Sequence, residues 1–159
     1  MKKDFSWLLV SQMNNITFRR ATIDDAELIS EMEKLNFSDP WDISAIKNVL
    51  DNPAVYFTVA ELDGIPVAYG GMTVVVDECD IINIAVMEHM RRMGIGRMLV
   101  QRMLDICKDL GVTEIFLEHR ESNIPAAVLY ESFGFSVYGV RRKYYSSPPE
   151  DAILRKISL

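Results

Sequence analysis

The 159-residue sequence has few cysteines, no long apolar run and no excess of positive charge. Its two cysteines, Cys79 and Cys107, have neither a CxxC partner nor a paired histidine, so we expect buried free thiols and no metal site. The longest apolar stretches, such as residues 70–76, are far shorter than the roughly 20 residues that cross a bilayer. The net charge of −6 disfavours nucleic-acid binding, because affinity for phosphate backbones comes mainly from cationic side chains.

The first 15 residues stand apart from the rest of the chain. Lys2 and Lys3 precede the apolar run WLLV, which is shorter than a signal-peptide core and lacks a small-residue cleavage site. We therefore expect a cytoplasmic protein with an N-terminal extension of unknown role over residues 1–15. The remainder, residues 16–159, is expected to form a single domain, since 49% hydrophobic and 25% charged residues is an ordinary globular balance.

Apolar periodicity and turn residues predict alternating strands and helices along this domain. The expected strands are residues 16–20, 55–62, 65–76, 81–86, 112–118, 135–144 and 151–159. The expected helices are residues 22–36, 43–50 and 95–110, and a last helix that Asn123 caps, with Pro125 in its first turn and residues 126–133 after it. Asp63 and Gly64 predict a type I′ hairpin turn, and acidic residues 77–80 are expected to turn the chain into the next strand. Strand, helix and strand over residues 81–118 imply a parallel crossover. We expect a mixed α/β fold with a mostly antiparallel central sheet and flanking helices.

An arginine- and glycine-containing turn, RRMGIG at residues 91–96, stands between an expected strand and an expected helix. Gly94 and Gly96 allow positive φ and close approach of the backbone to a ligand. The N–H groups of the first helical turn have no intrahelical partner, so a pyrophosphate would satisfy them. A P-loop does not fit, because Arg97 and Met98 follow the last glycine in place of Lys and Ser or Thr. Taken alone, the turn is equally compatible with an ordinary strand-to-helix connection.

A second motif, FLEHRESNIPAAVLYESFGF, occupies residues 116–135. The two motifs in this order resemble the acetyl-CoA site of the GNAT superfamily of N-acetyltransferases. FSDPW at residues 37–41, NIAV at 83–86 and RKYYSSPPEDA at 142–152 make the sequence most similar to the ribosomal-protein-alanine N-acetyltransferases, from residue 16 onward. His119 and the N-terminal extension depart from the usual pattern of that family.

The resemblance implies that the strands at 81–86 and 112–118 splay apart after a bulge and that acetyl-CoA lies in the gap. Backbone groups left without strand partners would then bind its pantetheine arm and stabilise the oxyanion of the tetrahedral intermediate. The cofactor-binding residues expected on this basis come from the strand, the glycine turn and a helix cap: Ile84, Ala85, Val86, Arg91, Arg92, Met93, Gly94, Ile95, Gly96, Arg97 and Asn123.

Glu118 and Tyr130 are the catalytic residues that the resemblance implies. Glu118, expected at the carboxyl end of its strand, would be the general base, and without the family motif it would be read as a solvated glutamate. Tyr130 would be the general acid for the thiolate, because a phenol has a pKa of about 10 and a thiol about 8.5. Its alternative role is that of a core tyrosine.

Three other titratable side chains compete with Glu118 for the role of base. His119 is expected to face away from Glu118 by strand alternation, and we interpret it as structural. Glu78 and Asp80, near the start of the other central strand, are further rivals.

The aromatic residues Trp41, Tyr144 and Tyr145 are expected to wall a groove for an extended acceptor N-terminus. The resemblance thus implies an enzyme that acetylates the N-terminal alanine of a ribosomal protein by direct transfer from acetyl-CoA in a ternary complex. Two alternatives remain open, namely an acetyltransferase of small amines or lysine side chains, and an acetyl-CoA-binding module without catalysis.

Overall fold

The computed structural model describes residues 15–159, so nearly all of the predicted N-terminal extension lies outside the described residues. Within this range the strands are β1 Ile16–Arg20, β2 Val55–Leu62, β3 Ile65–Val75, β4 Glu78–Val86, β5 Glu114–Arg120, β6 Ser136–Ser146 and β7 Pro149–Ser158. The α-helices are α2 Ala26–Asn36, α3 Ile43–Leu50, α4 Ile95–Asp109 and α5 Ile124–Ser132. Short 3-10 turns, Ile23–Asp25 and Glu88–Met90, precede α2 and the glycine turn.

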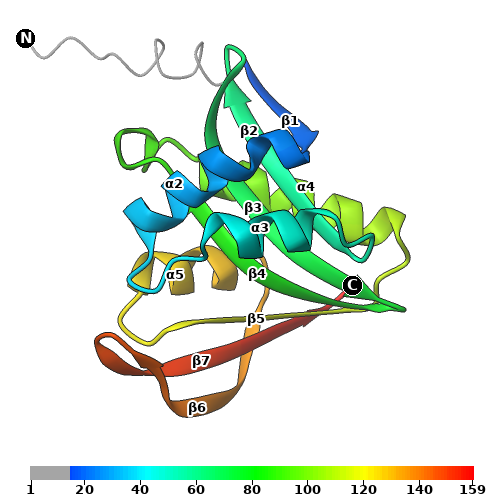
Figure 1. Ribbon diagram of the computed structural model, residues 1–159. Helices are drawn as coiled ribbons and strands as arrows, with labels where there is room; N and C mark the ends of the chain where they lie inside the picture. The colour runs from blue at the N-terminus through cyan, green and yellow to red at the C-terminus, as the bar shows by residue number, and fades with distance from the viewer. Residues whose placement is uncertain (1–14) are drawn as a thin grey trace, which may run out of the picture.

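The seven strands form one sheet in the order β1-β2-β3-β4-β5-β7-β6. Every neighbouring pair is antiparallel except β4 and β5, which run parallel on either side of the α4 crossover. Helices α2 and α3 lie on one face of the sheet, and α4 and α5 lie on the other (Figure 1). The predicted fold class is therefore confirmed.

A separate apolar core fills the space under each pair of helices. Under α4, the buried Leu99 and Met103 pack against the sheet, and a Cβ on Gly70 would come within 2.5 Å of the Met103 sulfur. Under α2 and α3, the buried Ile29 and Ile46 belong to the other cluster. Each fully buried side chain of this size contributes about 1.5–3 kcal/mol relative to exposure. The two helical layers are thus fixed on the sheet mainly by burial of apolar surface.

Local signals in the sequence set the starts of helices and the first hairpin turn as predicted. Asp42 Oδ1 accepts from the Ala45 N–H at 2.8 Å and caps α3, while Asn123 Oδ1 accepts from the Ala126 N–H at 3.2 Å and caps α5. Asp63 and Gly64 have φ values of 53° and 79°, which confirms the type I′ turn between β2 and β3.

The prediction that residues 77–80 form a turn was correct only for Asp77, which follows Val76 in a two-residue turn. The chain reverses at Val76, whose φ is 57°, and β4 already begins at Glu78. Cys79 is buried while Glu78 and Asp80 are exposed, so this part of β4 alternates between a covered and an open face. Acidic residues are compatible with a strand whose one face meets solvent.

Several predicted element ends were also displaced. β5 runs to Arg120, so Glu118 lies two residues before the end of its strand rather than at it. β5 pairs with β7 along its whole length, and this pairing holds the extra residues in strand conformation. Similarly, β6 and β7 extend until only Ser147 and Pro148 separate them.

The parallel strands β4 and β5 separate after three paired positions. Glu78, Cys79 and Asp80 pair with Glu114, Ile115 and Phe116, respectively. Beyond Asp80, β4 continues along β3 and β5 continues along β7. The register with β3 shifts where Gly71 faces Asn83 and Met72 faces Ile81, so Ile82 is an extra, bulged residue. The splayed pair and the bulge implied by the family resemblance are therefore present.

Candidate functional site

The glycine turn leads into α4 beside the opening between β4 and β5. Gly94 is the N-cap of α4 and has a left-handed backbone, with φ 81° and ψ 2°. A Cβ on Gly96 would meet nothing nearer than Leu129 and Val86, both at 3.8 Å, so packing within the protein does not require a glycine there. The free N–H groups of the first turn of α4 suit an anionic group at this end of the opening.

Two arginines of the predicted set connect this turn to the neighbouring elements. Arg91 donates through Nε to the Val86 carbonyl at 3.3 Å and through Nη2 to Asn36 Oδ1 at 2.5 Å. Arg97 donates to Ser132 Oγ at 2.7 Å, and its guanidinium lies 4.8 Å from the centre of the Phe133 ring. Both guanidinium groups are therefore held close to the turn by contacts on opposite sides of it.

The remaining predicted cofactor residues divide between the turn, the strand and the helix cap. Arg92 and Met93 lie in the turn itself, with Arg92 at a φ of 62°. Ile95 is buried in the α4 core, so it offers only its backbone N–H to a ligand.

Ile84, Ala85 and Val86 pair with β3 on one side, and the side toward β5 has no pairing within the described residues. The Asn123 oxygen already caps α5. The predicted set thus comes from three segments, namely the turn before α4, the β4 strand and the cap of α5.

Glu118 is an exposed side chain on the α2–α3 face of the sheet and has two partners from β6. Its Oε1 accepts from the Tyr144 hydroxyl at 2.7 Å, and its Oε2 lies 3.6 Å from Arg141 Nη1. The hydrogen bond to Glu118 raises the pKa of Tyr144. Partial desolvation of the Asp80 carboxyl, although the residue as a whole is exposed, and the negative charge of Glu118 raise the pKa of Asp80. A tyrosine, an arginine and a second carboxylate therefore surround the proposed base.

Tyr130 approaches the same region from the opposite side of the sheet. It is 8% exposed, and burial raises its pKa to about 12. Its ring lies 5.8 Å from that of Phe135 and 6.0 Å from that of His119. The phenol is therefore protonated at neutral pH and able to donate a proton.

His119 faces away from Glu118 and belongs to a buried polar cluster, which supports the structural interpretation. Its Nε2 accepts from Arg155 Nε at 2.9 Å, and its Nδ1 lies 2.8 Å from the Arg120 carbonyl. Arg155 also donates to Glu131 Oε1 at 2.7 Å. Burial lowers the pKa of His119. Both ring nitrogens have partners, so His119 is not placed to accept a proton from an acceptor amine.

A buried carboxylate ties the α2–α3 connector to the bulged part of β4. Glu33, on α2, is 2% exposed and accepts hydrogen bonds from the Tyr69 hydroxyl, from Asn83 Nδ2 at 2.8 Å and from the Trp41 N–H at 3.0 Å. Trp41 itself is half-buried against the α2–α3 core. Glu33 therefore fixes the position of Trp41 relative to the opening.

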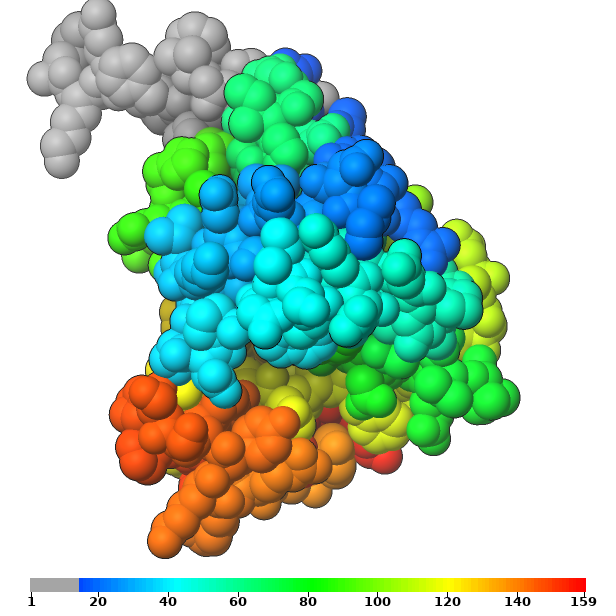
Figure 2. All heavy atoms as spheres, in the orientation of Figure 1, coloured from blue at the N-terminus to red at the C-terminus, as the bar shows by residue number. Residues whose placement is uncertain are grey.

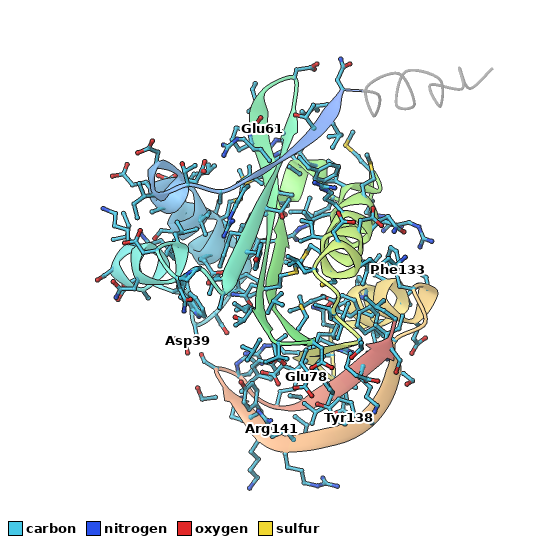
Figure 3. All side chains as sticks on the ribbon, turned by 90° about the vertical axis from the view of Figure 1, so that its right-hand side faces the viewer. Asp39, Glu61, Glu78, Phe133, Tyr138 and Arg141 are labelled. Atoms are coloured by element: carbon cyan, nitrogen blue, oxygen red, sulfur yellow. The ribbon has the colours of Figure 1, made fainter. Side chains whose placement is uncertain are left out.

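The α2–α3 face is hollowed between the helices and the β6–β7 hairpin (Figure 2). Tyr144 and Tyr145 belong to this hairpin, with ring centres 5.1 Å apart and planes nearly perpendicular. Figure 3 shows Asp39, in the α2–α3 connector, and Phe133, after α5, on opposite sides of the sheet. Tyr144 reaches Glu118 on the α2–α3 face, and Tyr145 is near enough to Tyr130 to contribute to its raised pKa.

Sequence reasoning missed Glu33, Arg120 and Arg155 as members of this site. Glu33 follows Ile29 by four positions, so a charged residue on the apolar stripe of a helix was a usable signal. Arg120 follows Glu118 by two positions and therefore shares its face of the strand. Arg155 is a buried residue of β7, and its partners His119 and Glu131 come from distant segments that the sequence does not reveal.

Comparison with known proteins identifies a family model and several relatives. The model of the acetyltransferase (GNAT) family matches residues 26–135. The [ribosomal protein bS18]-alanine N-acetyltransferase of Salmonella typhimurium is 33% identical over 151 residues, covering 92% of this chain and 99% of that protein. The crystal structure of the ribosomal-protein-S18-alanine N-acetyltransferase from Escherichia coli has a TM-score of 0.84 at 30% identity, covering 90% of this chain and 93% of that one.

A more distant structure shares the fold. NAA60 of Arabidopsis thaliana in complex with acetyl-CoA has a TM-score of 0.82 at 16% identity, covering 91% of this chain and 99% of that one. Across residues 15–159, no helix is both long enough and apolar enough to span a membrane. The same residues contain no group of three or more His, Cys, Asp or Glu side chains arranged to hold a metal ion.

Proposed function

The chain belongs to the acetyltransferase (GNAT) family, and we propose that it transfers an acetyl group from acetyl-CoA to the N-terminal alanine of a ribosomal protein. The observation that carries this proposal is the opening between β4 and β5, with the glycine turn at one end and Glu118 and Tyr130 on its two sides. The names of relatives at 32–33% identity over most of the chain support the acceptor. We assign the activity to residues 16–159 and place it in the cytoplasm, where ribosomal proteins are made.

The proposed transfer requires a neutral amine, a stabilised oxyanion and a protonated leaving group. Glu118 accepts a proton from the acceptor ammonium, and the amine nitrogen then attacks the thioester carbonyl carbon. Among residues 84–86, the backbone N–H groups that point away from β3 have no partner on β5, and they stabilise the negative oxygen, a contribution typically worth about 3–4 kcal/mol. Tyr130 gives its proton to the sulfur as the carbon–sulfur bond breaks, and the proton that the nitrogen loses on becoming an amide restores the phenol. Neither residue forms a covalent bond to the acetyl group.

The cofactor contacts in this proposal come from the same three segments. The first turn of α4, with Gly94 and Gly96, would bind the pyrophosphate, and Arg91 and Arg97 would add positive charge beside it. The unpaired edge of β4 would bind the extended arm. On the other face, Glu118 and Asp80 give the groove negative charge that suits a cationic N-terminus.

The test is mass spectrometry of peptides incubated with the protein and acetyl-CoA. One peptide begins with alanine and contains an internal lysine, and its matched control has the same sequence with a blocked N-terminus. We expect a single acetyl group on the N-terminal nitrogen of the first peptide and none on the control. Acetylated lysine in both peptides would favour the lysine or small-amine alternative. Binding of acetyl-CoA without product on any acceptor would show a non-catalytic module.

A further inference from the structure

Arg120, the last residue of β5, contacts two segments that are far from it in sequence. Its Nη1 donates to the Pro148 carbonyl at 3.0 Å and to Glu150 Oε2 at 3.1 Å. Its Nη2 donates to the Ser147 carbonyl at 3.1 Å and to Ser38 Oγ at 3.1 Å. Ser38 lies in the α2–α3 connector, and the other three partners lie at the β6–β7 turn. One side chain therefore joins both walls of the hollow on the α2–α3 face.

The same guanidinium also fixes an aromatic ring of the groove. Its carbon lies 4.2 Å from the centre of the Tyr145 ring, within the range of a cation–π contact. The planar fork of arginine can make this stacking contact and four hydrogen bonds at once, whereas a lysine ammonium has one centre and three donors. These contacts therefore require an arginine at position 120, and a lysine with the same positive charge would not make all of them.

Glu150 extends the arrangement to the segment before α5. Its Oε1 accepts from the Ser122 N–H at 2.5 Å while its Oε2 binds Arg120. Hydrogen bonds from Ser122 and then from Arg120 hold the pKa of Glu150 below its ordinary value, so it is ionised at neutral pH. Because Ser122 directly precedes the cap of α5, the acceptor walls are linked to the helix that carries Tyr130.

We propose that Arg120 is a positioning residue for the acceptor, holding the α2–α3 connector and the β6–β7 turn at a fixed separation and orienting Tyr145 in the groove. The proposal rests on the proposed function for the identity of the acceptor, but the geometry of the two walls can be tested without any substrate. Arg120 does not contact the reacting atoms in this scheme, so its loss affects binding of the peptide more than binding of acetyl-CoA.

The first test is hydrogen exchange of the free protein, followed by mass spectrometry. We expect Arg120→Lys to increase exchange in peptides covering residues 37–42 and 146–150, with α4 unchanged. Arg142→Ala is the matched control, because Arg142 is 85% exposed and its ion pair with Asp151, at 3.7 Å, lies outside the Arg120 contacts. Unchanged exchange at both walls in Arg120→Lys would overturn the proposal, whatever the acceptor proves to be.

The second test separates the two substrates kinetically. Arg120→Lys and Glu150→Gln are expected to raise the KM for the acceptor peptide about tenfold, because charge-assisted hydrogen bonds at one wall are lost. The KM for acetyl-CoA should stay within about twofold of the original value. An equal rise in both KM values, or no rise for the peptide, would contradict a role in positioning the acceptor. If the unmodified protein acetylates no peptide, the proposed function fails, and the exchange experiment still decides the role of Arg120.

Discussion

The two faces of the sheet differ at the opening between β4 and β5. On the α4–α5 face the surroundings are mainly apolar, and Tyr130, His119 and Arg155 are buried there. On the α2–α3 face, Glu118 and Asp80 are exposed, and Arg141 is within reach of Glu118. A neutral thioester arm suits the first environment and a cationic amine the second. The difference teaches that the fold can bring two substrates with opposite solvation needs to one point from opposite sides.

Loss of the carboxylate on the polar face is expected to have the largest effect. Glu118→Gln removes the proposed proton acceptor, and kcat/KM should fall about 100-fold or more, as is typical for a general base. Thiol release from acetyl-CoA measures the rate. Glu121→Gln, on an exposed residue just after β5, is the matched control and should have little effect.

Asp80 provides a direct comparison with Glu118. Because the charge of Glu118 helps to raise the pKa of Asp80, Glu118→Gln should move that pKa down toward its ordinary value. Asp80→Asn is expected to lower kcat/KM less than Glu118→Gln does. A larger loss for Asp80→Asn would transfer the role of base to Asp80.

On the apolar face, Tyr130→Phe removes only the hydroxyl from a packed ring. We expect kcat to fall about tenfold to 100-fold, because the thiolate would leave unprotonated. Both KM values and the Tm should change little, since the ring contacts with Phe135 and His119 remain. Tyr138→Phe, on a residue that is 50% exposed, is the control. A Tyr130→Phe protein with full kcat would show that Tyr130 is a core residue only.

Alanine substitutions at two glycines should distinguish an effect on binding of the cofactor from an effect on packing of the protein. Gly96→Ala should raise the KM for acetyl-CoA about tenfold, because a methyl group in the first turn of α4 would hinder close approach of the pyrophosphate to the backbone N–H groups. Its Tm should not fall, since alanine is the better helix former and the nearest protein atoms are 3.8 Å from the added carbon. Gly71→Ala should instead lower the Tm and leave the KM for acetyl-CoA unchanged, because its Cβ would lie 2.6 Å from the Phe57 ring. We expect it to lower stability by about 1–3 kcal/mol. Thermal melts and saturation kinetics of the two variants distinguish the effects.

The smallest expected effect is the pH dependence of the free energy of unfolding that arises from His119. The folded-state pKa of His119 lies below its ordinary value of 6.5, mainly because burial disfavours the imidazolium. Unfolding therefore takes up a proton as the pH falls below 6.5, and the free energy of unfolding decreases in acid. His119→Val should remove this dependence and shift the acid Tm by about 2–4 °C relative to its value at neutral pH. If the pH profile of the Tm were the same in the variant, the loss of stability in acid would not arise from His119.

Most of the fold was predictable because its signals are local. The Asp63 and Gly64 turn, the cap at Asn123 and the periodic apolar residues of α4 depend on neighbours within a few residues. The ends of β4 and β5 were not predictable in this way. Acidic residues such as Asp80 resemble turn residues in sequence, and only pairing with strands from elsewhere in the chain makes them part of β4.

The candidate site likewise contains residues that the sequence identifies and residues that only the three-dimensional structure reveals. Motif residues such as Glu118 and Tyr130 could be identified from family resemblance, and their roles remain predictions. The groups that hold them come from distant segments: Tyr144 and Arg141 bind Glu118 from β6, and Arg155 joins His119 from β7. Such partners depend on the order of strands in the sheet, which no short motif encodes.

The bulge at Ile82 gives β4 two phases of side-chain alternation. Before it, Cys79 and Ile81 point to the α4 core, whereas after it Ile84 and Val86 do so and Ala85 joins the α2–α3 core. Odd-numbered residues thus serve one core in the first half of the strand and the other core in the second half. Deleting this one residue would move every later side chain of β4 to the opposite face of the sheet. The shape of the opening therefore depends on the number of residues in β4 as much as on their identity.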